Sequence, residues 1–133
     1  MMRRLFLVFA LSLALVLVGC EDGEFTAVDP PGGGTREVVL ELTSSEPLTA
    51  GDPFTVRATV TENGEPVVLT DVAFTAVNGT SESRLVSPSV VQTAVILGTA
   101  DTTVNTAATD RSITVTATAG TASDVQTYTL VAR

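Results

Sequence analysis

The stretch PFTVRATVT, residues 53–61, decides the fold class, because apolar and polar side chains alternate along it residue by residue. In an extended chain this alternation sends successive side chains to opposite faces, and one face collects Phe54, Val56, Ala58 and Val60. Threonines and an arginine lie between them and suit a face in contact with water. Because threonine and valine are β-branched and favour extended backbone, the stretch predicts a β-strand with one buried face.

The same alternation recurs in VVLELTS (38–44), DVAFTAV (71–77) and SITVTATAG (112–120). Turn-forming clusters such as SSEPLTAGDP, ENGEP and AGTASD separate the runs at short spacing. Roughly seven short strands in a domain of this size are typical of a β-sandwich. We therefore predict an all-β domain over residues 37–133. Its core is expected to contain Val56, Val60, Phe74, Ile113 and Val115, while Arg57, Thr59, Thr114 and Thr116 face water.

The segment between the predicted strands at 71–77 and 112–120 is harder to interpret. Its run Ala94–Leu97 is continuously apolar, which predicts either a buried strand or a strand that crosses between sheets. Asn78-Gly79-Thr80 fits the N-glycosylation pattern, but an Asn-Gly pair also tolerates the left-handed backbone of a tight turn. We favour the turn.

The first 20 residues have a different character. Arg3 and Arg4 precede the uncharged run Leu5–Val18. A membrane-spanning helix needs about 20 apolar residues, whereas the apolar core of a secretory signal peptide needs about 7–15. The run fits the shorter range and is followed by the small residue Gly19. Residues 1–19 are therefore predicted to be a cleavable signal peptide.

The last residues of this signal, Leu17, Val18 and Gly19, together with Cys20 resemble a bacterial lipobox, the processing site of exported lipoproteins. The resemblance implies that the thiol of Cys20 receives a diacylglycerol and that the signal is cut before this residue. A thiolate is a strong nucleophile for such a thioether, and two or more acyl chains give stable anchoring. The membrane is then a partner through the lipid on Cys20. An uncleaved anchor and an ordinary buried cysteine are the alternatives.

Residues 20–36 form the next section, in which Cys20 is followed by a polar and acidic segment broken by Pro30-Pro31 and three glycines. Such a composition predicts a flexible tether without regular structure. Loss of two of the seven arginines with the signal leaves five against 15 acids, a net charge of about −10. A strongly acidic surface repels phosphate backbones, so nucleic acid is not an expected partner.

The domain also resembles a known family. LTAGDPFTVRATVTENGEPVVLTDVAFTAVNG (48–79) is similar to the first half of a bacterial immunoglobulin-like domain of the invasin and intimin group, and ITVTATAGTASDVQTYTLVA (113–132) to its last hairpin. Residues 81–106 lack the Asp-x-x-Gly turn usual in that group. The resemblance implies an immunoglobulin-like sandwich with a structural or adhesive role at the cell envelope, with an unknown protein or surface partner.

Two other functions stay open: an accessory subunit of an envelope complex, and a small-ligand or carbohydrate-binding module. The resemblance to adhesins favours the outer membrane, on its periplasmic face or at the cell surface. The acidic pair Glu21-Asp22 could instead favour retention at the inner membrane.

Catalysis is not expected. The chain has no histidine or lysine, and a lipidated Cys20 would leave no thiol, which excludes serine–histidine and cysteine–histidine arrangements. Carboxylate pairs such as Asp101 with Asp110 remain, but sugar hydrolysis usually needs aromatic rings as well, and these are scarce. We predict a protein that is not an enzyme and needs no cofactor.

Calcium is the one metal for which the sequence offers ligands, because calcium takes oxygen atoms from carboxylates and carbonyls. The candidates are clustered around one loop: Glu62, Asn63, Glu65 and Asp71. Three other acids, Asp52, Asp110 and Asp124, fall in other predicted turns. Because none of these acids has the spacing of a calcium-binding loop, we expect them to be solvated turn residues, and no metal site is predicted.

Overall fold

The computed structural model describes residues 34–133, in which Thr35–Arg133 form one compact unit. The predicted signal peptide, the lipobox residues, Cys20 and the tether up to residue 33 lie outside the described residues. The first strand begins at Arg36, one residue before the predicted start of the domain. No helix occurs within residues 34–133, and the all-β prediction is confirmed for this part of the chain.

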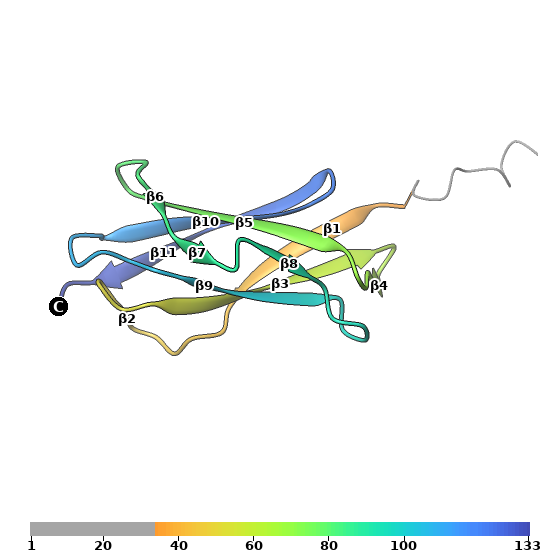
Figure 1. Cartoon of the computed structure of the whole chain (residues 1–133), viewed down its shortest axis with the longest axis horizontal. Coiled ribbons are helices and arrows are strands. Elements are labelled where there is room, and N and C mark those ends of the chain that lie inside the picture. The colour runs from red at the N-terminus through yellow and green to blue at the C-terminus, as the bar shows by residue number, and fades with distance from the viewer. Residues whose placement is uncertain (1–33) are drawn as a thin grey trace, which may run out of the picture. The chain divides into compact units, whose positions relative to one another are not determined.

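Two sheets pack face to face (Figure 1). The first has the order β1-β3-β9-β7, with β4 attached to β3; these strands are β1 (Arg36–Leu42), β3 (Phe54–Glu62), β9 (Thr99–Val104), β7 (Val86–Ser87) and β4 (Glu65–Pro66). The second has the order β2-β11-β10-β5-β6, with β8 attached to β5; these are β2 (Leu48–Thr49), β11 (Ala122–Val131), β10 (Ser112–Ala119), β5 (Asp71–Asn78), β6 (Ser83–Arg84) and β8 (Val90–Gln92). Strands β1, β3, β9 and β7 correspond to A, B, E and D of an immunoglobulin sandwich, and β5, β10 and β11 to C, F and G.

The core lies between the inner faces of the two sheets. In β3 and β10 every second residue is buried, which is the period of two seen in the sequence. All five residues predicted to face inward are buried: Val56, Val60, Phe74, Ile113 and Val115. The four residues predicted to face water, Arg57, Thr59, Thr114 and Thr116, are half-buried on the outer faces. Phe54 meets Tyr128 edge-on, with ring centroids 5.4 Å apart, a favourable aromatic geometry.

The apolar run Ala94–Leu97 is neither a buried strand nor a crossing strand, and both predictions for it are wrong. The chain reverses there between β8 and β9, with the Ala94 amide donating to the Thr99 carbonyl at 2.8 Å. Gly98 completes the reversal at φ 61°, where a Cβ atom would lie 2.8 Å from the Val60 carbonyl oxygen. The side chains of Val95, Ile96 and Leu97 therefore project into solvent.

Candidate functional site

The first candidate site is the turn between β3 and β4, which carries three of the four calcium candidates. Asn63 and Gly64 both have positive φ, 53° and 85°, as a two-residue hairpin turn requires. Glu62 ion-pairs with Arg36 at 3.4 Å, and the Thr35 amide donates to Asn63 Oδ1 at 3.3 Å. Two of the candidates therefore hold the start of β1 against β3.

The other two candidates, Glu65 and Asp71, are exposed, on β4 and at the start of β5. Asp71 lies opposite Gln92 of β8. Over residues 34–133 there is no group of three or more acidic, cysteine or histidine side chains placed to hold a metal ion. The structure does not bring Glu62, Asn63, Glu65 and Asp71 together as a ligand set.

We expect the melting temperature of the protein to be the same in millimolar calcium and in chelator. The reason is that Glu62 is already paired with Arg36 and that Asp71 lies on another strand. Differential scanning calorimetry under the two conditions is the measurement. A rise of several degrees with calcium would show that these acids rearrange to bind it.

A second candidate site is a buried ion pair at the opposite end of β5. Asp110 was predicted to be a solvated turn residue, and this prediction is wrong, because its side chain has no solvent-exposed area. Arg84 binds it with two parallel hydrogen bonds, from Nε to Oδ2 at 2.7 Å and from Nη2 to Oδ1 at 2.6 Å. The Ala107 amide donates to Oδ2 at 2.8 Å, and Asn78 Nδ2 donates to Oδ1 at 3.2 Å.

This arrangement stabilises the charged form of Asp110. The hydrogen bonds from Arg84 hold the pKa of Asp110 well below its usual range, against the opposing effect of burial, and the Ala107 and Asn78 donors add to the lowering. Donors that are directed at a carboxylate favour ionisation in this way. The cluster joins β6, the last residue of β5 and the loop after β9.

The pH dependence of stability should reveal this carboxylate. Because the folded pKa of Asp110 lies below its ordinary value of 3.8, its contribution is complete above that value and is lost as the pH falls further. We expect the melting temperature to fall between about pH 4 and pH 2, and to fall less steeply in Asp110→Asn. Asp101→Asn is the matched control at an exposed pair, and an equal effect of both substitutions would contradict the assignment.

Asn78 supports the same cluster in a way that the sequence prediction missed. Neither Asn78 nor Gly79 adopts the left-handed backbone we predicted for this turn, and the residue with positive φ is Ser81, at 65°. Instead, the Asn78 side-chain oxygen accepts hydrogen bonds from the backbone amides of Thr80 at 3.0 Å and Glu82 at 2.8 Å. The Nδ2 of the same side chain donates to Glu82 Oε2 at 3.1 Å and to Asp110 Oδ1.

The side chains of Asp101 and Asp124 also form hydrogen bonds within the domain. Asp101 lies directly across from Arg57 on the neighbouring strand and accepts two hydrogen bonds from it, at 2.7 and 2.8 Å. Asp124 was predicted in a turn, but it lies within β11 and accepts the Leu40 amide at 2.8 Å, which lowers its pKa. That contact ties β1 of one sheet to β11 of the other. The carboxylates Asp101 and Asp110 are therefore in separate ion pairs.

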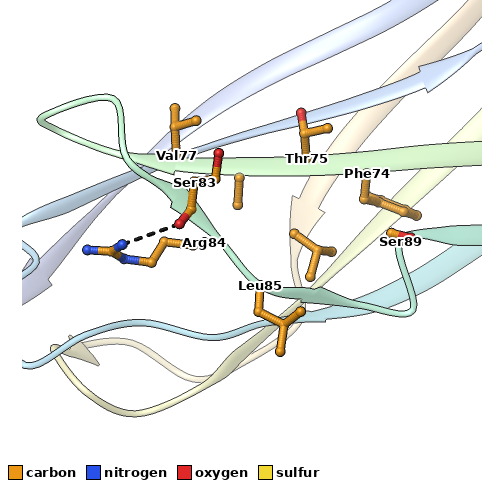
Figure 2. A pocket seen from close by; sticks show the side chains of 9 residues that line it. Phe74, Thr75, Val77, Ser83, Arg84, Leu85 and Ser89 are labelled. Atoms are coloured by element: carbon orange, nitrogen blue, oxygen red, sulfur yellow. Dashed lines mark hydrogen bonds between the residues drawn. The ribbon is translucent and has the colours of Figure 1, made fainter.

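A shallow groove with a volume of about 290 Å³ lies beside β5, where the chain leaves β6 and crosses to β7 (Figure 2). Its lining includes Phe74 and Val77 of β5, Arg84 of β6, Leu85 of the segment that crosses to β7, and Ser89 of the loop after β7. Ligand pockets are usually at least this large, deeply concave and supplied with converging polar groups. The groove offers an apolar floor and a few hydroxyls at its margin. No sequence signal marks it, because it depends on how the crossing segment packs.

The described residues contain no helix of the length and apolarity that crossing a membrane requires. No protein-family model matches the chain, and no curated protein matches it in sequence. Seven chains of solved structures match its fold. One is the crystal structure of domains 4 and 5 of the S-layer protein SbsC, with 21% identity and a TM-score of 0.51, over 74% of this chain and 54% of that one. The chain thus spans about half the length of that structure. At this identity the likeness is one of fold, and the class it supports is an all-β sandwich.

Proposed function

We propose that this chain is an exported bacterial lipoprotein whose sandwich acts as a structural or adhesive module at the cell envelope. The observation that carries the proposal is the sequence from Arg3 to Cys20: two positive charges, a short apolar run and a lipobox-like end. A compact domain that begins at Thr35 leaves the 14 residues 21–34 after Cys20 as the proposed tether. The outer membrane is the proposed location, on the resemblance to adhesins.

We also propose that the module does not catalyse a reaction. Its two best-placed carboxylates, Asp101 and Asp110, are each held by an arginine. Tyr128, the one tyrosine of the chain, is half-buried against Phe54. The groove beside β5 is shallow. The fold likeness to domains of an S-layer protein agrees with a structural envelope role and carries no residue-level argument.

Lipidation is tested at the cysteine itself. Cys20→Ala should abolish incorporation of labelled fatty acid and leave an uncleaved precursor, because the thioether forms on this sulfur atom. Cys20→Ser is the matched control for size and polarity and should behave in the same way. The measurement is metabolic labelling followed by mass determination of the purified chain. Equal labelling of the wild type and both variants would contradict the proposal.

A further inference from the structure

Two neighbouring loops place apolar side chains at one end of the sandwich. The loop after β4 and the loop between β8 and β9 are joined by backbone hydrogen bonds, from the Leu69 amide to the Thr93 carbonyl at 3.1 Å and from the Thr93 amide to the Thr70 carbonyl at 2.8 Å. The buried Thr93 hydroxyl donates to the Val67 carbonyl at 2.8 Å. We call the exposed apolar residues of these loops the apolar tip: Val68, Leu69, Val95, Ile96 and Leu97.

The apolar tip is unfavourable in water. Ile96 is 81% exposed, between Val95 at 67% and Leu97 at 62%, and Leu69 is 58% exposed. Single exposed apolar residues are ordinary, but a consecutive exposed run beside a second loop of the same kind indicates an interaction site. Leu69 also has φ 52°, a backbone region that a leucine rarely adopts. Such strain is concentrated at functional sites.

The position of the apolar tip indicates what covers it. Figure 1 shows both loops at the end of the sandwich where β1 begins, whereas the C-terminus lies at the far end. Backbone contacts agree: the Asn63 amide donates to the Thr35 carbonyl at 3.2 Å, and the neighbouring Val60 amide donates to the Gly98 carbonyl at 2.9 Å. The apolar tip is therefore at the same end as the point where the chain from Cys20 enters the domain.

We propose that the apolar tip rests in the interfacial region of the lipid bilayer to which Cys20 is anchored. This inference rests on the proposed function. Only 14 residues, 21–34, separate Cys20 from the domain, and a chain of that length spans at most about 50 Å even when fully extended. The tether therefore keeps the entry end of the domain close to the membrane. Tethering also raises the local concentration to about the millimolar range, so that a weak apolar contact is enough.

The charged residues around the apolar tip indicate which lipid headgroups it can approach. Glu65 and Asp71 flank the loop that carries Leu69, and both are exposed. Arg36, at the same end of the described domain, is already paired with Glu62. Anionic headgroups would be repelled by these carboxylates, whereas zwitterionic headgroups would not. The apolar tip therefore fits a neutral lipid surface, with the acids remaining in water above it.

A spin label at the tip tests this contact in the full lipidated protein. Ile96→Cys carries the label, because the sulfur of Cys20 is consumed by lipid and the new thiol is unique. The protein is reconstituted in phosphatidylcholine vesicles, and relaxation of the label by oxygen is compared with relaxation by a water-soluble nickel chelate. We expect oxygen to be several-fold more effective at position 96. Thr109→Cys, in an exposed loop at the far end, should show the reverse preference.

Two matched variants test whether the apolar tip, and not the hydrophobicity of the spin label itself, causes insertion into the bilayer. Val95→Asp with Leu97→Asp should return the label at position 96 to water, whereas Val131→Asp, an exposed valine near the C-terminus, should not. Vesicles rich in phosphatidylglycerol should weaken the oxygen preference. More effective relaxation by the nickel chelate than by oxygen at position 96, in the lipidated protein without further substitutions, would overturn this inference but not the proposed function. Protection of the label from both reagents would also overturn it, because the apolar tip would then be covered by a second copy of the chain. A wild type that carries no lipid and does not bind vesicles would overturn the proposed function as well.

Discussion

Replacing Phe74 with alanine is expected to lower the free energy of unfolding by about 3–5 kcal/mol. Phe74 is 2% exposed in the middle of β5, where it lies opposite Ala117 of β10. Removing the ring deletes a large buried surface and leaves a cavity that a two-sheet core cannot close. A domain of this size is stabilised by only about 5–15 kcal/mol in total. Urea unfolding monitored by circular dichroism is the measurement.

Thr75→Ala is the matched control for Phe74→Ala, because Thr75 is the next residue of β5 and is exposed on the opposite face. It should change the stability by less than about 0.5 kcal/mol. A loss below about 1 kcal/mol for Phe74→Ala, with a native spectrum, would mean that the two sheets do not pack on this face of β5.

Asp110→Ala should lower the free energy of unfolding by about 3 kcal/mol, the lower end of the range for breaking a buried ion pair. The substitution leaves the Arg84 guanidinium, the Asn78 amide group and the Ala107 amide without their shared acceptor. The cost stays at the lower end because the Arg84 side chain is 16% exposed and can recruit water. Thermal and urea unfolding at pH 7 measure the loss.

Asp101→Ala is the control for this substitution. It removes a carboxylate that also makes two hydrogen bonds to one arginine, but whose side chain is 52% exposed. Solvent-exposed ion pairs contribute little, so a much smaller loss is expected. Equal losses for the two variants would show that the burial of Asp110 has no energetic consequence.

The long strands could be predicted from the sequence because the information that specifies them is local. Alternation along residues 54–61 and 112–119 fixes which side chains face inward, and the structure agrees at each of them. The Asn63-Gly64 turn is local as well. The conformation of residues 94–97 could not be predicted in this way, because the run has no alternation and its apolar composition alone predicts burial. The chain reversal observed there depends on the close approach of Gly98 to Val60 and Val67, which are distant in sequence.

The roles of Asp110 and Asp124 could not be predicted, because their partners are distant in sequence. Arg84 lies 26 residues from Asp110, and Leu40 lies 84 residues from Asp124. An isolated acid beside glycine, threonine or alanine has the composition of a solvated turn. Pairing of β6 with β5 and of β5 with β10, within one sheet, brings Arg84 and Asn78 to Asp110. Packing of one sheet on the other brings Asp124 to the Leu40 amide.

The opposite placement of the two ends of the domain has a mechanical consequence. β1 enters at one end of the sandwich and β11 finishes at the other (Figure 1), and β1 is paired with β3 along its whole length, from Arg36 opposite Glu62 to Leu42 opposite Val56. Tension between the two ends runs parallel to these strands. This tension would shear the β1–β3 ladder, so that all of its hydrogen bonds bear the force at the same time and do not break one after another. The bond from the Leu40 amide to Asp124 resists the same sliding motion from the other sheet. The domain therefore holds its shape under a pull applied between its two ends.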